Sequence, residues 1–148
     1  MAVRRVVMLG GTGFVGRAIV ARLAAAGHPV TVLTRHRERH RELLVHPTVT
    51  LLERDIHNVE VLKREFAGQD AAINLVGILN ERGRTGAGFE RAHAGLATRV
   101  VEACRAAKVP RLLHMSALNA APGAPSEYLR SKGRGEQTVH EAHGPELR

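Results

Sequence analysis

A glycine-rich turn near the amino terminus constrains the fold of this chain more than any other feature. The turn is Gly10-Gly11-Thr12-Gly13-Phe14-Val15-Gly16, and it follows Val3–Leu9, a nearly continuous apolar run rich in valine. Such a run is typical of a parallel strand that is buried on both faces. From Phe14 to Ala26 apolar residues recur at helical spacing, and Gly27 ends the pattern. We therefore expect a strand, a tight turn and a helix in direct succession.

The rest of the chain continues the alternation of strand and helix. Further strands are expected at Val30–Thr34, Thr48–Leu52, Asp70–Val76 and Arg111–Met115. Helices are expected at Arg37–Val45, at Val59–Phe66, at Phe89–Lys108, and from a cap at Ser126 to about His143. This alternation predicts an α/β fold, a doubly wound parallel sheet with helices on both faces, and 148 residues suit one Rossmann-type domain over residues 1–148.

The carboxyl end, Gly144–Arg148, combines turn residues with the opening of a further strand. A domain that ends there lacks whatever follows its last helix. We therefore expect a domain that is truncated at its carboxyl terminus.

The chain is strongly basic, with a formal net charge of +8, and its densest cluster of cations is Arg35–Arg41. Clustered arginine is a common mark of phosphate binding. One tyrosine, three phenylalanines and no tryptophan leave little for base stacking, and no nucleic-acid motif surrounds them. We interpret the charge as a solvated basic surface and expect no nucleic-acid partner, since a dinucleotide offers the phosphates that such cations meet.

Cysteine usage and hydropathy limit the location of the chain. The single cysteine, Cys104, cannot form an internal disulfide, so we expect a buried thiol and a cytoplasmic protein. Met1–Leu9 is too short for a signal segment, and no apolar run approaches the length of a bilayer span. Membrane insertion is not expected, whereas peripheral association and the oligomeric state stay open.

Three glycines of the turn have separate expected roles. Gly10 permits the tight turn, Gly13 lets the backbone approach a pyrophosphate, and Gly16 lets the helix pack closely on the strand. The phosphates then meet free N–H groups at the positive end of the helix, including those of Thr12, Phe14 and Val15. The turn therefore predicts a bound adenine dinucleotide, and the alternative is a tight turn without a ligand.

The end of the second strand indicates which dinucleotide is preferred. NAD(H)-binding folds place an acidic residue there to bind the ribose hydroxyls, whereas this chain has Thr34 and Arg35. A guanidinium binds a 2′-phosphate that a carboxylate would repel, so NADP(H) is favoured and NAD(H) stays open. Arg17 points to the same region, unless both arginines are merely solvated. Asp55, with Ile56 beside it, follows the third strand and either contacts the adenine or caps the next helix.

Tyr128 and Lys132 lie four residues apart in the last expected helix, which places both side chains on one face. A phenol is a poor proton donor or acceptor at neutral pH, but a neighbouring ammonium favours the phenolate. Such a pair can move a proton while a nicotinamide moves a hydride. We interpret it as a candidate acid/base pair, the alternative being two unrelated surface residues.

Together these motifs resemble the extended or atypical branch of the short-chain dehydrogenase/reductase superfamily. The matching segments are GGTGFVG at 10–16, Asp55, INLVG at 73–77, HMSALNA at 114–120 and YLRSK at 128–132. Within the branch, HMSALNA followed by YLRSKGRGEQ resembles the group that contains the nucleotide-binding accessory subunit of respiratory complex I and bacterial epimerase/dehydratase-like relatives. Order and spacing of the segments cover essentially the whole chain.

The resemblance implies roles for several residues. It implies that Tyr128 is the acid/base, that Lys132 binds the nicotinamide ribose, and that the cofactor is lined by Leu75, Val76 and Gly77. It also implies relatives of about twice this length, with their substrate-binding part in the carboxyl-terminal half.

Two positions depart from the family pattern. The catalytic serine or threonine of the family usually falls one or two places after Ser116, where this chain has Ala117 and Leu118. Ser116 is the candidate substitute, although neighbouring positions of a strand alternate sides and its hydroxyl could face away. His93 occupies the place where extended members commonly have asparagine, and it is either a structural histidine or part of a proton relay.

Two functions remain after these observations. The first is an oxidoreductase or epimerase/dehydratase that uses NADP(H) with Tyr128 and Lys132 on an unknown small-molecule substrate. The second is a non-catalytic NADP(H)-binding subunit or redox-sensing module of a respiratory or quinone-related assembly, which the missing serine favours. A nucleic-acid binder would rest on charge alone.

Overall fold

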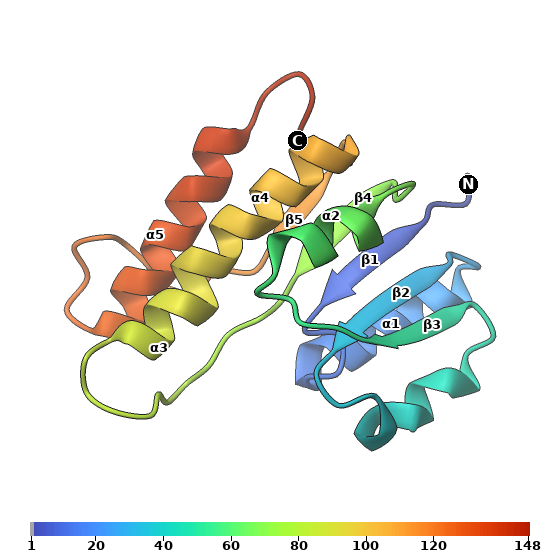
Figure 1. Cartoon of the computed structure of the whole chain (residues 1–148), viewed down its shortest axis with the longest axis horizontal. Coiled ribbons are helices and arrows are strands. Elements are labelled where there is room, and N and C mark those ends of the chain that lie inside the picture. The colour runs from blue at the N-terminus through green and yellow to red at the C-terminus, as the bar shows by residue number, and fades with distance from the viewer. Residues whose placement is uncertain (1) are drawn as a thin grey trace.

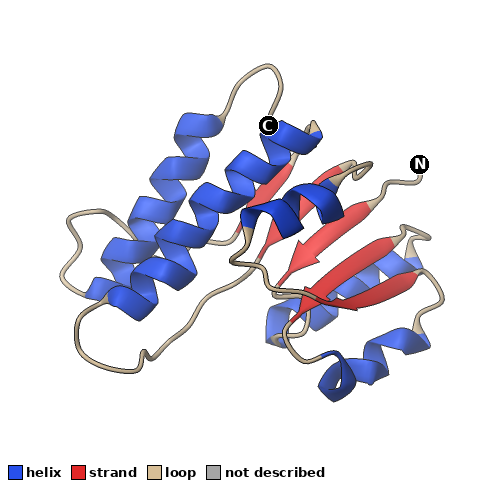
Figure 2. Ribbon diagram, in the orientation of Figure 1, coloured by secondary structure: helices blue, strands red, loops and turns tan. Residues whose placement is uncertain are grey.

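The computed structural model describes residues 2–148 and contains a five-stranded sheet in the order β3-β2-β1-β4-β5, with all neighbouring strands parallel (Figures 1 and 2). The strands are β1 (Val6–Leu9), β2 (Val30–Thr34), β3 (Val49–Glu53), β4 (Ala71–Asn74) and β5 (Leu112–His114). This order confirms the doubly wound sheet that the sequence predicts. Strand β2 lies on one side of β1 and β4 on the other, so the connections from these strands run in opposite directions. A crevice therefore opens at the carboxyl ends of β1 and β4.

Helices cover both faces of the sheet, as Figure 1 shows. One face is covered by α1 (Phe14–Ala25) and the 3₁₀ segment η1 (Arg37–Val45), which bring Val20 and Leu43 onto the sheet. The other face is covered by α2 (Val59–Phe66) and by the continuous helical run α3 (Ala87–Glu90), η2 (Arg91–Gly95) and α4 (Leu96–Ala107). The last helix, α5 (Glu127–Ala142), packs against η2 and α4.

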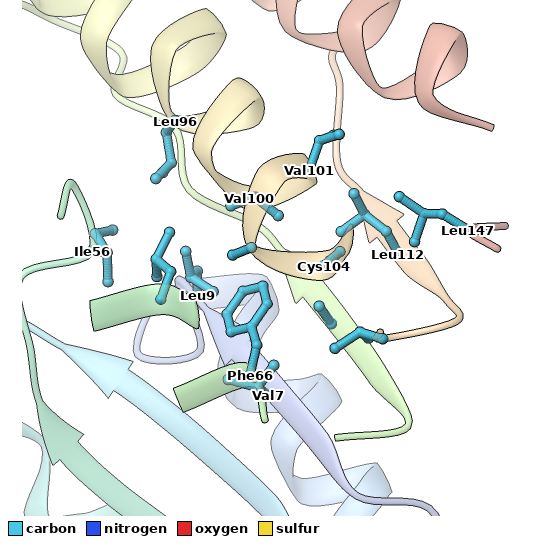
Figure 3. Packing of buried hydrophobic residues seen from close by; sticks show 14 of the residues in the cluster. Val7, Leu9, Ile56, Phe66, Leu96, Val100, Val101, Cys104, Leu112 and Leu147 are labelled. Carbon is cyan, nitrogen blue, oxygen red and sulfur yellow. The ribbon is translucent and has the colours of Figure 1, made fainter. Parts of the chain in front are cut away.

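Strand β1 supplies apolar side chains to both cores. Val7 and Leu9 face α2 and α4, whereas Val6 and Met8 face α1, and none of the four is more than 4% exposed. Figure 3 shows the first core, in which Phe66 lies against the β1 side chains. Each such side chain contributes roughly 1.5–3 kcal/mol by leaving water. Burial on both faces explains why Val3–Leu9 has no alternation of polar and apolar residues.

Several boundaries differ from the sequence-based expectation. Strand β4 ends at Asn74 rather than at Val76. The Oδ1 atom of Asn74 accepts a hydrogen bond from Val76 N at 3.1 Å, and this bond turns the chain away from the strand. The helix expected at Phe89–Lys108 begins at Ala87, contains the π-helical turn η2, and ends before Lys108, which has a positive φ of 56°. The segment Arg37–Val45 is 3₁₀-helical, with a kink at His40.

The carboxyl terminus pairs with the edge of the sheet. Arg148 N donates to Pro110 O at 3.0 Å, and Arg148 O accepts from Leu112 N at 2.8 Å. These two hydrogen bonds join Arg148 to the edge of β5 in the pattern of parallel strands, although no sixth strand is formed within residues 2–148. Among residues 2–148 no helix is long and apolar enough to cross a membrane. Cys104 is fully buried, and burial raises the pKa of its thiol to about 12, which makes it an unreactive core residue.

The glycine turn is held against the protein backbone at two points. Gly10 has a φ of +79°, and a Cβ on it would lie 2.9 Å from Leu75 C. A Cβ on Gly16 would lie 2.3 Å from Gly10 O and 2.6 Å from Gly11 Cα. These distances support the expected roles of Gly10 in the turn and of Gly16 in close packing of α1.

We expect Gly16→Ala to lower the free energy of unfolding by about 2 kcal/mol, because the added methyl meets backbone atoms that cannot move aside. This loss exceeds the roughly 0.8–1 kcal/mol by which alanine favours a helix over glycine. Urea unfolding followed by circular dichroism measures it. The control is Gly123→Ala, whose Cβ would have nothing within 4 Å and which should change stability by less than about 0.5 kcal/mol. Equal midpoints for the two variants would contradict this packing.

Candidate functional site

A cleft of about 640 Å³ lies at the carboxyl ends of β1, β2 and β4. Its walls come from the glycine turn, the end of β2, the segment before α2, the loop after β4 and the start of η2. The lining residues are Gly10, Thr12, Gly13, Leu33, Thr34, Arg35, His36, His40, Ile56, His57, Leu75, Val76, Gly77, Ile78, Arg82, Gly88, Arg91 and Ala92. They include three arginines and no carboxylate, so the cleft is suited to an anionic ligand.

The amino terminus of α1 opens onto this cleft without a partner of its own. Gly13 is the N-cap residue, no side chain caps the helix, and its first turn has no acidic residue. A Cβ on Gly13 would meet only Gly10 O, at 3.4 Å, so space remains beside the backbone. The N–H groups of Phe14, Val15 and Gly16 belong to this first turn, where unpaired N–H groups and the helix dipole favour an anion. The turn therefore fits a pyrophosphate, as the three glycines predict.

Phe14 and Val15 line no wall of the cleft with their side chains. The Phe14 ring is 95% exposed and the Val15 side chain 40% exposed. Both residues can therefore act on a bound dinucleotide through their backbone rather than through their side chains.

Arg17 and Arg35, the two arginines that the sequence assigns to the cofactor, have different surroundings. Arg35 is exposed and lines the cleft, and the ion pairs among residues 2–148 do not include it. Arg17 instead donates to Thr12 O at 2.8 Å, contacts His40 Nδ1 at 3.1 Å and forms an ion pair with Glu42. Arg17 thus ties the glycine turn to η1, whereas Arg35 retains its donors for a ligand.

The segment after β3 contains both a turn and part of the cleft wall. The carboxylate of Asp55 accepts from His57 N at 2.9 Å, and the cap of α2 is Asn58, which accepts from Glu60 N and Val61 N. The helix-cap alternative for Asp55 is therefore wrong, because the chain turns for three further residues before α2 begins. Ile56 and His57 line the cleft. Burial lowers the pKa of His57, and the Arg91 guanidinium lowers it further, so the ring is neutral at pH 7.

The loop after β4 joins the cleft to the Tyr128–Lys132 pair. Leu75, Val76 and Gly77 line the cleft, as the resemblance implies. A Cβ on Gly77 would lie 3.8 Å from Lys132 Nζ and 3.6 Å from His93 Nε2. The ammonium of Lys132 therefore lies beside Gly77, just outside the cleft lining.

Lys132 and Tyr128 lie on α5, which begins at the Ser126 cap. Lys132 is only 4% exposed, and its Nζ donates to Met115 O at 2.6 Å. Burial lowers its pKa, although Glu136 acts in the opposite direction. An ammonium has three donors, so two remain for a bound ribose or water. The Tyr128 ring is half-buried and makes edge contacts with Phe89 and His93, at centroid distances of 6.0 and 5.4 Å.

Ser116 lies between β5 and the loop that leads to α5. Its Oγ is buried and has no hydrogen-bond partner among residues 2–148, Tyr128 included. Leu118, two positions on, is 87% exposed. Ser116 thus has an unused hydroxyl next in the chain to Met115, the residue that accepts the Lys132 hydrogen bond, and this hydroxyl makes no hydrogen bond to the Tyr128 phenol.

Sequence reasoning missed several basic residues of the cleft, among them His57, Arg82 and Arg91. His57 directly follows Asp55 and Ile56, which the sequence predicts to contact the cofactor, so its position in the chain could have indicated that it belongs to the site. Arg82 and Arg91 come from the loop after β4 and from η2, and no local pattern indicates that this segment folds back over the glycine turn.

Comparison with known proteins supports the interpretation of this cleft as a dinucleotide site. The profile of a family described as NAD(P)H-binding matches residues 10–143. The NADH-ubiquinone oxidoreductase 40 kDa subunit of Neurospora crassa is 33% identical over 135 residues, which are 89% of this chain and 36% of that protein. A ceramide reductase of Caulobacter vibrioides is 34% identical over 140 residues, which are 93% of this chain and 42% of that protein.

A solved structure shows the fold alone, because its sequence is distant. The UDP-Glc/GlcNAc 4-epimerase from Campylobacter jejuni superposes with a TM-score of 0.81 at 18% identity, covering 94% of this chain and 49% of the epimerase. The chain thus spans less than half the length of these three proteins. Since the family profile matches most of the chain and the cleft has the glycine turn, this chain belongs to the NAD(P)H-binding family of extended short-chain dehydrogenases/reductases.

Proposed function

We propose that this chain binds NADP(H) and works as the cofactor domain of an NADP(H)-dependent oxidoreductase or epimerase/dehydratase. One observation supports the proposal above all: a single cleft without carboxylates runs from Arg35 to Gly77, and Gly77 lies beside the buried Lys132 ammonium. The adenosine end would then meet a guanidinium, and the nicotinamide end would meet Lys132. The reductases among the relatives, such as the ceramide reductase, agree with this class of reaction.

The residues of the site would divide the chemistry among them. Bound NADPH would supply a hydride to a carbonyl carbon of the substrate. Tyr128 would donate its phenolic proton to the carbonyl oxygen, and the Lys132 ammonium would favour the phenolate that remains. Lys132 would also orient the ribose with the two donors that Met115 O leaves unused. Since Ser116 makes no hydrogen bond to Tyr128, Tyr128 would be the principal donor to that oxygen.

Cofactor preference tests the assignment of Arg35. NADPH should bind about tenfold or more tightly than NADH, and Arg35→Gln should remove most of this difference, because a charge-assisted bond to phosphate contributes about 1.5–3 kcal/mol. Isothermal titration calorimetry with both cofactors measures it. Arg39→Gln is the matched control, since Arg39 is exposed in the same basic cluster but does not line the cleft. Equal affinities for NADPH and NADH in the unchanged protein would refute the NADP(H) preference.

Catalysis by Tyr128 is tested by removing one oxygen atom. Tyr128→Phe should lower the rate of NADPH oxidation with a responsive ketone by about 10²–10⁴-fold, as expected for loss of a general acid, and leave the NADPH affinity within about twofold. The assay uses the product of the whole reading frame and a panel of ketones that includes long-chain 3-oxo compounds. A variant as fast as the unchanged protein would rule out an acid role for Tyr128.

A second candidate function is a non-catalytic NADP(H)-binding subunit. Two observations favour it: Ala117 and Leu118 stand where the family has its serine, and one relative is a subunit of NADH-ubiquinone oxidoreductase. In that case NADPH would still stabilise the fold, because the cleft and the glycine turn would be retained for structure. NADPH binding without turnover of any ketone would support this function over the first.

A further inference from the structure

His93 connects two parts of the site that are remote in the sequence. It lies in the π-helical turn η2 and is 2% exposed. Its Nε2 accepts a hydrogen bond from Ile78 N at 3.1 Å, in the loop that lines the cleft after β4. Its Nδ1 lies 2.8 Å from Ser131 Oγ on α5. Turns of π-helix are rare and are often found at functional sites.

The hydrogen bonds assign the protonation state of the ring. A backbone N–H can only donate, so Ile78 requires an unprotonated Nε2. The Ser131 hydroxyl donates to Tyr128 O at 2.9 Å and therefore accepts from His93 Nδ1. The ring is thus neutral with its proton on Nδ1. Burial first, and then the charge of Lys132 on α5 and the ring of His114 on β5, lower the pKa of His93 to about 4, although the hydrogen bond from Ile78 N acts in the opposite direction.

Both nitrogens of His93 are therefore occupied, which argues against a proton relay. We call the cleft-lining loop after β4, residues 75–78, the cofactor loop. A continuous path of hydrogen bonds leads from Ile78 in this loop through His93 and Ser131 to the backbone of Tyr128. The His93 ring also forms an edge contact with the Tyr128 ring and stacks on Phe89 at 5.8 Å. A Cβ on Gly135 would lie 3.2 Å from His93 O, so α5 and η2 are in close contact at this residue.

We infer that His93 is a positioning residue that fixes the cofactor loop at Ile78 and the Tyr128 side chain relative to each other. It does so through a neutral ring that accepts from one element and donates to another. The inference depends on the proposed function only for the catalytic meaning of Tyr128. Its geometry is testable on the chain alone, without a substrate.

The composition of the chain allows a direct spectroscopic test. Tyr128 is the only tyrosine and there is no tryptophan, so the tyrosine band of near-ultraviolet circular dichroism reports the packing of Tyr128 alone. His93→Leu should reduce this band at least about twofold while the far-ultraviolet spectrum is retained, because the ring contact and the Ser131 bond are both lost. It should also weaken NADPH binding about three- to tenfold, since Ile78 N loses its partner in the cofactor loop.

Two further variants make the test specific. His93→Gln can place a carbonyl oxygen near the position of Nε2 and should restore NADPH affinity to within about twofold of the unchanged protein. His28→Leu is the control for loss of a buried histidine: His28 is 8% exposed and accepts from Arg4 N at 3.1 Å before β2, away from the cleft. It should lower stability but leave the tyrosine band and the NADPH affinity unchanged.

A measurement on the unchanged protein covers the case in which the His93 variants fail to fold. Nitrogen NMR of labelled histidine should show one buried ring that stays neutral, with its proton on Nδ1, across about pH 5 to 8. A charged His93 ring in this pH range, or a His93 proton on Nε2, would overturn the inference. So would a folded His93→Leu variant whose tyrosine band and NADPH affinity are unchanged. Failure of Tyr128→Phe to slow turnover would instead refute only the proposed catalysis.

Discussion

The close contact between the glycine turn and the loop after β4 is the constraint on which the site depends. Gly10 lies so near Leu75 and Val76 that no side chain fits between them, and Gly16 lies as near to the turn itself. Both contacts bring the start of α1 to the crevice where the strand order changes direction. The glycine turn before that helix and the loop after β4 therefore both line one cleft.

Charge then determines what the cleft can bind. Carboxylates are present nearby, but they have partners of their own, since Asp55 bonds to His57 N and Glu42 pairs with Arg17. The lining that remains has arginines and histidines but no acid, so anionic ligands are favoured. The excess of basic residues is thus concentrated partly in the cleft, although two arginines of the Arg35–Arg41 cluster, Arg37 and Arg41, form ion pairs with Glu38.

The far end of the cleft is organised by buried polar groups. Lys132 and His93 are both nearly inaccessible to water, and each is held by a backbone group from another element, Met115 O and Ile78 N respectively. An unsatisfied polar group at such depth would cost about 1–3 kcal/mol, so these bonds restrict the positions that α5 can adopt. The helix that bears Tyr128 is consequently located by hydrogen bonds as well as by apolar packing.

The sequence determined the local features of this protein. The glycine spacing, the apolar runs and the four-residue separation of Tyr128 and Lys132 predict the turn, the strands, the helices and the shared helix face, since each depends on residues close in the chain. Tertiary structure alone decided that Asn58 rather than Asp55 caps α2, that Arg91 reaches the cleft, and that His93 joins the cofactor loop to α5. These contacts link residues from different elements, and their partners depend on how whole helices pack, which no local pattern specifies.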